Sequence, residues 1–330
     1  MTVIQSILLG VGVFSLLCCG TLAAQQPLFP ESESASQAYQ ALAAHHFDEA
    51  IADFEKALKT SPESAQLHDG LGAALLGKGK LEAALGEFRT AGLLNPQDAS
   101  AKSHLGMALL RAGNHKGAIE ALSSVAKMEP SSAEAHYHLG LALSVSGQAA
   151  PAAAEFRRAL EIQPDNPQAL NDLGVALVAL GKTAAASNEF RQAIKLRPNY
   201  VEARDNLGLA ELHEGKIPDA VAEFRQTLHI KPGYKLARLH LGMGLLQEGS
   251  TDEAIAELQP LVASTPSNAQ GHYVLGLAYL KKLRHEQAIV EFRKAIAIRP
   301  RFPKALNNLG IALAEEGQFG KAVPQFRAAT

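Results

Sequence analysis

Apolar and small residues recur at helical spacing along most of this chain. The stretch from Asn166 to Pro198 shows the pattern: a segment with one apolar face, a turn at Gly181, and a second such segment that stops at the proline. Spacings of three and four residues place the apolar side chains on one face of an α-helix. The stretch therefore predicts two amphipathic helices joined by a glycine turn.

This helix pair repeats with a period of 34 residues. With Ala65 as position 1, small or apolar residues occupy positions 7, 8, 11, 20, 24 and 27 in nearly every unit. Leu-Gly pairs mark positions 7 and 8 at Leu71-Gly72, Leu105-Gly106, Leu139-Gly140, Leu173-Gly174, Leu207-Gly208, Leu241-Gly242, Leu275-Gly276 and Leu309-Gly310. Position 24 holds Phe88, Phe156, Phe190, Phe224, Phe292 and Phe326, with Leu122 and Leu258 in the other two repeats. Such regularity predicts an array of helical repeats.

The residues that begin, end and connect the helices recur with the same period. Proline recurs at position 32, where it stops the second helix, and glycine recurs at the turn between the helices, with Leu283 as the exception. Pro260 falls inside a second helix and is expected to kink or shorten it. The expected N-caps of the first helices are Ser64, Asp98, Ser132, Asn166 and Asn268.

These registers divide the chain into units of about 31–64, 65–98, 99–132, 133–166, 167–200, 201–234, 235–268, 269–302 and 303–330. The first unit is atypical, with Gln37-Ala38 in place of Leu-Gly, as expected where one face of an array meets water. The last unit is short, and we expect its outer face to be uncovered.

The Leu-Gly pair, the Ala at position 20, the Phe at 24, the Ala at 27 and the Pro at 32 resemble the tetratricopeptide repeat (TPR) over residues 37–330. The chain departs from that family at position 4, which often holds Trp there and holds His, Lys, Leu or Arg here. The resemblance implies an all-α fold, a right-handed superhelical solenoid of about nine helix-turn-helix units. It also implies that the first helices line a concave groove.

Composition agrees with an array of small units. Only 5% of the residues are aromatic and none is Trp, which suits short interfaces between neighbouring repeats better than one large core. The formal net charge of −2 offers no basic excess for a phosphate backbone, so we expect no nucleic-acid partner.

Residues 1–24 differ from the rest of the chain. An apolar run from Ile7 to Leu17 is followed by small residues and then by polar Gln25, which is the layout of a secretory signal peptide. An uncleaved membrane anchor and a lipid-modified Cys18 or Cys19 remain alternatives. Each of these predicts an exported protein of the periplasm or cell envelope, with a polar leader at 25–36 and no membrane contact beyond the N-terminal segment. Because both cysteines lie in this segment, a cleaved chain would have no thiol.

A polar stripe on the first helices is the candidate binding surface. Positions 2, 5, 6, 9, 12 and 13 lie beside the buried stripe and are expected to face the groove. Its amide, imidazole and carboxyl groups resemble the Asn ladder of O-linked N-acetylglucosamine transferases, which grips a peptide backbone; a merely solvated stripe is the alternative. The predicted partner-binding residues are Tyr137, His138, Asn171, Asp172, Asp205, Asn206 and His240.

The charge of this stripe suggests what it binds. Glu134, Asp172, Glu202 and Asp205 would make the middle of the groove acidic, which favours a neutral or basic partner.

No chemistry-bearing motif stands out. A phosphate loop, a dinucleotide fingerprint, a nucleophile elbow and a His-Glu-x-x-His sequence are all missing, so no catalytic residue, cofactor or metal is predicted. His104 and His138, one repeat apart, are expected at about the 10 Å spacing of packed helices, too far to share an ion.

The sequence therefore predicts a non-enzymatic scaffold that binds a protein or an extended peptide. Two alternatives remain: a membrane-attached accessory factor for envelope or pilus assembly, and the repeat part of a larger glycosyltransferase-like enzyme.

Overall fold

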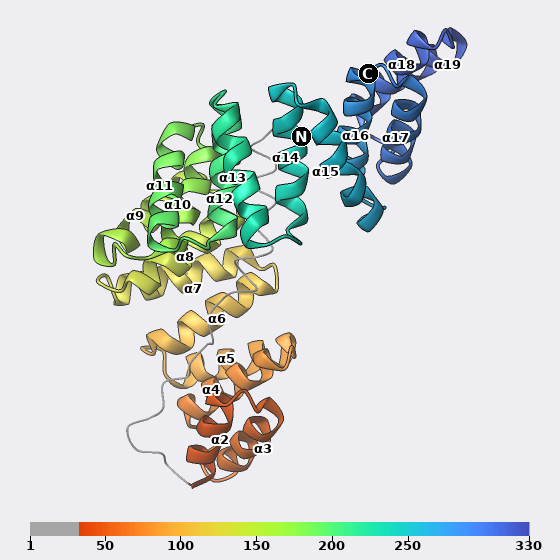
Figure 1. Ribbon diagram of the computed structural model, residues 1–330. Coiled ribbons are helices and arrows are strands. Elements are labelled where there is room, and N and C mark those ends of the chain that lie inside the picture. The colour runs from red at the N-terminus through yellow and green to blue at the C-terminus, as the bar shows by residue number, and fades with distance from the viewer. Residues whose placement is uncertain (1–32, 330) are drawn as a thin grey trace. The chain divides into compact units, whose positions relative to one another are not determined.

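Every element of the structure, a computed structural model that describes residues 33–329, is an α-helix (Figure 1). The signal-peptide prediction falls outside this range. The described helices form two compact bodies, which we call the N-terminal body (residues 33–182) and the C-terminal body (residues 183–329). No described helix has the length and apolar composition needed to cross a bilayer.

The N-terminal body contains α2 to α10. Their bounds are α2 Glu33–Ala43, α3 Phe47–Leu58, α4 Ala65–Gly77, α5 Leu81–Leu94, α6 Ala99–Arg111, α7 His115–Met128, α8 Ala133–Val145, α9 Ala149–Ile162 and α10 Pro167–Ala179. Helix α2 begins at Glu33, inside the segment predicted as a polar leader, and Ala35 in its first turn is buried. The ring of Tyr39, further along α2, is also buried and packs edge-on against Phe54.

The C-terminal body contains α11 to α19. Their bounds are α11 Thr183–Leu196, α12 Val201–His213, α13 Ile217–Ile230, α14 Lys235–Glu248, α15 Thr251–Ser264, α16 Ala269–Lys281, α17 His285–Ile298, α18 Pro303–Glu315 and α19 Phe319–Ala329. The helices α12 to α19 pair in order, and each pair packs on the next.

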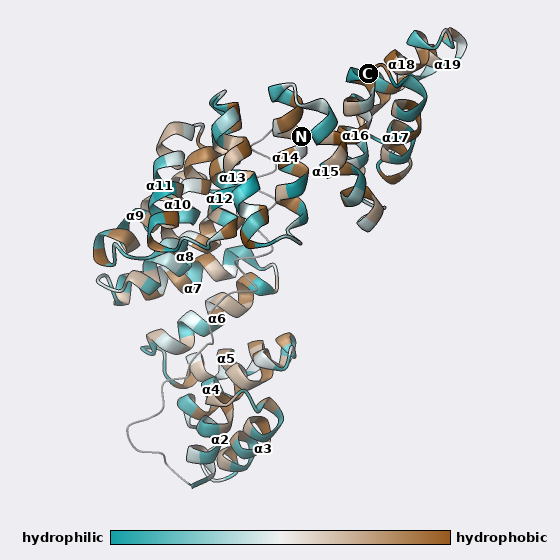
Figure 2. Ribbon diagram, in the orientation of Figure 1, coloured by the Kyte–Doolittle hydropathy of each residue, from teal (hydrophilic) through white to brown (hydrophobic). Residues whose placement is uncertain are grey.

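The predicted helix signals are confirmed. All five predicted N-caps accept a bond from a backbone N–H in the first turn, as Asp98 does from Ala101 at 3.1 Å. The turn glycines adopt positive φ, and Leu283 takes the same left-handed conformation with φ 56°. Brown and teal residues alternate along the helices in Figure 2, as expected for amphipathic segments.

Pro260 does not shorten its helix. Helix α15 has 14 residues, as many as α13 and α17, so this part of the prediction was wrong. Pro260 and Ala256 are both exposed, so the carbonyl that loses its helical bond faces water and costs little.

The core of each pair is a close approach between position 8 and position 24. A Cβ on Gly72 would lie 2.6 Å from the ring of Phe88, and one on Gly208 would lie 2.6 Å from the ring of Phe224. Phe88 and Phe224 are both 0% exposed, so the rings have nowhere to move. The glycine lets two helix backbones meet, and the ring fills the space between them.

Successive first helices also contact one another. Within the N-terminal body α4 touches α6 and α6 touches α8, and within the C-terminal body α12 touches α14 and α14 touches α16. Among the described helices, no two successive second helices make comparable contact. Each body therefore curves toward its first helices, which form its inner face.

The close approach yields a stability prediction. Gly72→Ala should destabilise the protein by about 1–3 kcal/mol, because the added methyl overlaps a ring that cannot move. Gly92→Ala in α5 is the matched control: nothing lies within 4 Å of its added methyl, so it should stabilise by up to about 1 kcal/mol. Urea unfolding followed by circular dichroism measures both, and equal effects would contradict the packing argument.

Candidate functional site

The predicted partner-binding residues are paired across repeats. Position 5 of one first helix bonds to position 6 of the next, 35 residues later. In the N-terminal body, His104 Nδ1 donates to Asp69 at 2.8 Å, and the Tyr137 hydroxyl donates to Asp172 at 2.9 Å. In the C-terminal body, His240 Nδ1 donates to Asp205 at 2.8 Å. We call these bonds the 5–6 ladder.

Burial follows from this pairing. Tyr137 and His138 are half-buried, and the other five predicted residues are buried. Their exposed fractions are 4% for Asn171, 1% for Asp172, 4% for Asp205, 7% for Asn206 and 2% for His240. The stripe at positions 5 and 6 is therefore largely internal, and partner binding by these seven residues stays a prediction.

Asp172 is the most strongly perturbed member of the ladder. Burial raises its pKa to about 6, although the Tyr137 hydroxyl and the Asn171 amide donate to its oxygens and oppose the rise. The pKa of His138 moves in the opposite direction. Burial lowers this pKa, Glu134 opposes the decrease, and nearby His104 adds to it. Both shifts favour neutral groups in the inner face.

The acidic character predicted for the groove is correspondingly smaller. Asp172 and Asp205 are buried and bonded to neighbouring repeats, so they do not face a partner. Glu134 remains with its side chain 79% exposed, and Glu202 is half-buried.

A second set of recurrent bonds involves position 4, where the chain departs from the Trp that is common in the tetratricopeptide repeat. The position-4 side chain bridges a carboxylate on the second helix of its own repeat and the proline carbonyl of the preceding repeat. His136 contacts Glu155 at 2.7 Å and the Pro130 carbonyl at 3.2 Å. The same bridge is made by His68, Arg204, Arg238 and His272, with Glu87, Glu223, Glu257 and Glu291. Sequence reasoning missed it, although the pairing recurs at a separation of 19 residues.

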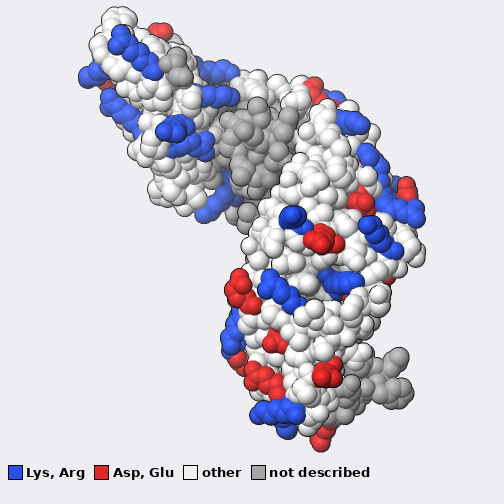
Figure 3. Space-filling model, turned by 180° about the vertical axis from the view of Figure 1, so that it is seen from behind, with Lys and Arg blue, Asp and Glu red and all other residues white. Residues whose placement is uncertain are grey.

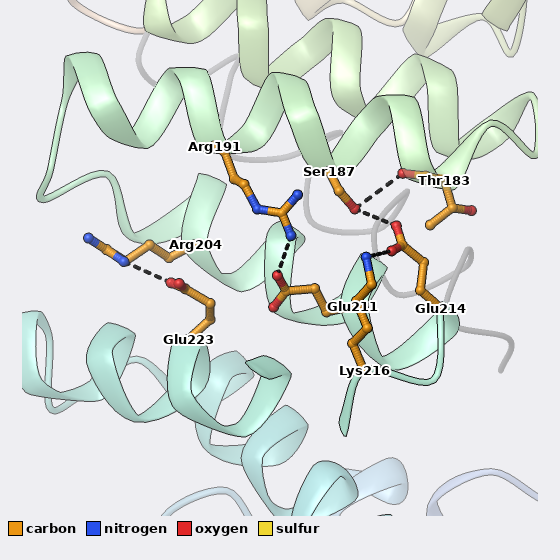
Figure 4. A network of polar contacts seen from close by, with 8 residues as sticks. All are labelled: Thr183, Ser187, Arg191, Arg204, Glu211, Glu214, Lys216 and Glu223. Atoms are coloured by element: carbon orange, nitrogen blue, oxygen red, sulfur yellow. Dashed lines mark hydrogen bonds and ion pairs between the residues drawn. The ribbon is translucent and has the colours of Figure 1, made fainter. Parts of the chain in front are cut away.

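One polar network interrupts the apolar core of the C-terminal body (Figure 4). Glu211 occupies position 11, which is Leu or Tyr in the other repeats from residue 65 onward. It is 3% exposed and accepts from Arg191 at 2.7 Å, while its Oε2 has no hydrogen-bond partner. Burial raises the pKa of Glu211, and the Arg191 guanidinium opposes that rise.

The network continues toward the turn that follows α12. Glu214 accepts from Ser187 at 2.7 Å and from Lys216, and Ser187 also donates to the Thr183 carbonyl at 3.2 Å. Every charged group drawn in Figure 4 is paired with an opposite charge within the network. The bonds from Arg191 and Ser187 thus join α11 to α12 and to the turn that follows it, and the Arg204–Glu223 pair joins α12 to α13.

No metal centre is present among residues 33–329, where no three His, Cys, Asp or Glu side chains are grouped suitably for an ion. The bonded His–Asp pairs have no described nucleophile in hydrogen-bond reach of the same ring.

Comparison with known proteins agrees with this arrangement. A family model described as tetratricopeptide repeat matches residues 104–167, 171–235 and 239–301. Two further models of the same description match residues 41–106, and residues 155–186 and 291–323. No curated protein matches by sequence.

Solved structures share the fold at low sequence identity. A chain of the APC/C hetero-tetramer Cut9–Hcn1 aligns with a TM-score of 0.62 and 18% identity, over 85% of this chain and 55% of that chain. A tetratricopeptide repeat protein from Parabacteroides merdae aligns with a TM-score of 0.60 and 16% identity, over 79% of this chain and 98% of that chain. This chain thus spans 55% of the Cut9–Hcn1 chain that it matches.

The raised pKa of Asp172 predicts a pH effect on stability. The folded protein keeps this proton up to about pH 6, whereas the unfolded chain loses it near its ordinary value of 3.8. Between these values the folded state binds more protons, so the contribution of Asp172 to stability falls as pH rises. At pH 7.5 Asp172→Asn should therefore be more stable than wild type by about 1–3 kcal/mol.

Urea unfolding of the wild type and of Asp172→Asn between pH 4 and 7.5 checks this prediction. The difference in unfolding free energy should shrink toward zero as the pH falls to about 4. Asp165→Asn, at an exposed site, is the control and should show a flat difference. A difference for Asp172→Asn that does not change with pH would refute the assignment.

The pair between half-exposed Arg191 and buried Glu211 gives another prediction. Arg191→Ala leaves a buried carboxylate unpaired and should cost about 1–3 kcal/mol, at the low end because the Arg191 side chain is 45% exposed. Glu211→Leu restores the common residue of position 11 and should be neutral or stabilising by about 1–3 kcal/mol. When Glu211 is already Leu, adding Arg191→Ala should lower the unfolding free energy only slightly. A double-mutant cycle measured by urea unfolding checks this. Additive effects would show that the two side chains do not depend on each other.

Proposed function

This chain belongs to the tetratricopeptide repeat family, and from that premise we propose that it is a non-enzymatic scaffold which binds an extended peptide or protein segment along its first helices. The observation that carries the proposal is the inner face of each body. There, successive first helices touch and the buried 5–6 ladder bonds them together. A surface held in this way is ordered before a partner arrives, so binding loses little conformational entropy.

The residues available to a partner lie beside the ladder. Positions 2, 6, 9 and 13 align along one side of a helix, and the ladder uses position 6. Position 2 offers exposed Gln66 and Glu134 in the N-terminal body, and half-buried Glu202 and exposed Leu236 in the C-terminal body.

Position 9 is apolar. It is accessible in the C-terminal body, where Met243 is half-buried and Ile311 is 36% exposed, whereas Leu141 in the N-terminal body is buried. In the C-terminal body, neighbouring polar and apolar contacts suit a polypeptide better than a small charged ligand.

The charge of the middle repeats supports a neutral or basic partner. Across residues 133–234, Glu134 and Glu202 are the acidic side chains at positions 2 and 13, one in each body, and no Lys or Arg stands there. The outer repeats carry exposed Arg111, Lys281 and Lys304 at these positions. The partial exposure of Glu134 and Glu202 lets them attract a cationic side chain without the desolvation cost of a buried acid.

Selection from a phage-displayed library of unstructured peptides tests the proposal. The wild-type chain should select peptides that are neutral or basic. Glu134→Lys combined with Glu202→Lys should weaken the selected peptides by about tenfold or more in fluorescence anisotropy, because like charges then face each other.

Charge reversal on second helices provides the control. Glu120→Lys in α7 combined with Glu286→Lys in α17 changes two exposed acids by the same amount and should leave peptide affinity unchanged. Failure to select any peptide, or equal losses in both pairs of variants, would count against binding along the first helices.

A further inference from the structure

The last helix presents an apolar face that no other described helix covers. On α19, Phe319, Val323 and Phe326 follow one another at helical spacing and are 66%, 47% and 36% exposed. These side chains form one stripe along the helix, because residues four and seven apart lie on the same side. We call this stripe the α19 face.

Two of the three positions are buried in earlier repeats of the C-terminal body, while Ile217 and His285, which match Phe319, are half-buried. Val221 and Ile289 match Val323 and are 2% and 6% exposed, while Phe224 and Phe292 match Phe326 and are 0% exposed. The α19 face is therefore the counterpart of a surface that is internal elsewhere in the same body.

A helix covers this surface wherever it is buried. The ring of His240 on α14 lies 5.7 Å from the ring of Phe224, and a Cβ on Gly244 would lie 3.0 Å from Val221. The covering helix thus places a medium-sized residue and, four positions later, a small one against the second helix. The α19 face has the same register and is shaped to receive a helix of this kind.

The last four helices carry an excess of positive charge. Residues 269–329, which form α16 to α19, contain ten Lys and Arg against four Asp and Glu, a net charge of +6 in a chain whose overall net charge is −2. Helix α19 itself carries Lys321 and Arg327 and no acidic residue. In Figure 3 blue atoms outnumber red ones over the end of the molecule built by these helices. A field of this sign attracts acidic partners and repels basic ones.

We propose that the α19 face is a second binding surface, separate from the first-helix surface, and that it takes an acidic amphipathic helix from a partner protein. The partner helix lays small and apolar residues over Phe319, Val323 and Phe326, and its acidic side chains approach Lys321 and the other cations of α16 to α19. The apolar contact supplies the affinity, and the charge supplies the choice of partner.

A second copy of this chain fits the face less well. Head-to-tail stacking would set α2 of one copy against α19 of another. The positions of α2 that would be covered hold Glu33, Gln37 and Gln40, all exposed and polar, where the other repeats have small or apolar residues. Burying these groups against Phe319 and Val323 would leave them without hydrogen bonds.

Binding of a synthetic probe by the full chain tests the proposal. The probe is a labelled peptide of about 18 residues with Ala, Leu and Gly on one helical face and Glu on the others, compared with a scrambled peptide of the same composition. Fluorescence anisotropy should show binding at least about tenfold tighter for the amphipathic peptide, weakening as NaCl rises from about 50 to 500 mM.

Matched variants locate the site. Phe319→Ser combined with Val323→Ser should reduce the affinity by about tenfold or more. Leu93→Ser on α5, which changes a side chain that is 80% exposed, should not. All three residues are well exposed, so circular dichroism should show unchanged helix content. The charge-reversed pair Glu134→Lys and Glu202→Lys should bind the probe as the wild type does, because the two surfaces are separate.

Three outcomes would overturn the proposal: equal affinity of the two peptides, equal affinity of Phe319→Ser/Val323→Ser and wild type, or co-sedimentation with anionic phosphatidylserine vesicles that depends on Phe319 while the peptide does not bind. The last outcome would assign the face to a membrane surface instead.

Discussion

The contact between the glycine at position 8 and the ring at position 24 sets the geometry on which the other interactions depend. Gly72 and Phe88 bring two helix backbones so close that a single methyl group would not fit between them. Because the same contact recurs at one period in both bodies, each helix pair has nearly the same shape as its neighbours. Stacking of similar units buries enough apolar surface for stability without large aromatic residues.

Polar bonds then fix how one pair follows another. The 5–6 ladder joins first helices on the inner face, as His240 and Asp205 show. The position-4 bridge ties five of the repeats to the proline before them, as His136 shows. Apolar packing alone tolerates small rotations between units, whereas hydrogen bonds between buried groups have defined distances and directions. The curvature of each body toward its first helices is thus set by specific side chains.

The sequence predicted what depends on short-range signals. The helix pairs, the turn glycines, the N-caps such as Asp98 and the filling role of Phe88 follow from spacing and backbone preference, and the structure confirms them. The burial of Asp172 and His240 did not follow, because it depends on the rotation between consecutive repeats, which periodicity does not define. Yet the sequence holds the evidence: donors and acceptors stand 35 residues apart at Asp69 and His104, and again at Asp205 and His240. Glu211 was likewise missed, since one polar residue in an apolar register is visible only when Arg191 is seen beside it.

The pairing of polar groups within the wall changes how this protein can recognise a partner. An amide or carboxylate that already bonds to the next repeat gains little by exchanging that bond for one to a ligand, because the net value of a hydrogen bond is small and its loss when buried is large. In the scaffold that we propose, selectivity therefore comes from side chains that make no such bond, such as exposed Glu134 beside the ladder and exposed Phe319 on α19. These two surfaces differ in charge and in shape. The first-helix surface carries polar and apolar side chains with carboxylates, whereas the α19 face is an apolar stripe on a helix whose charged residues are cations. A scaffold with two unlike surfaces can hold two unlike partners at once, since neither partner competes for the contacts of the other.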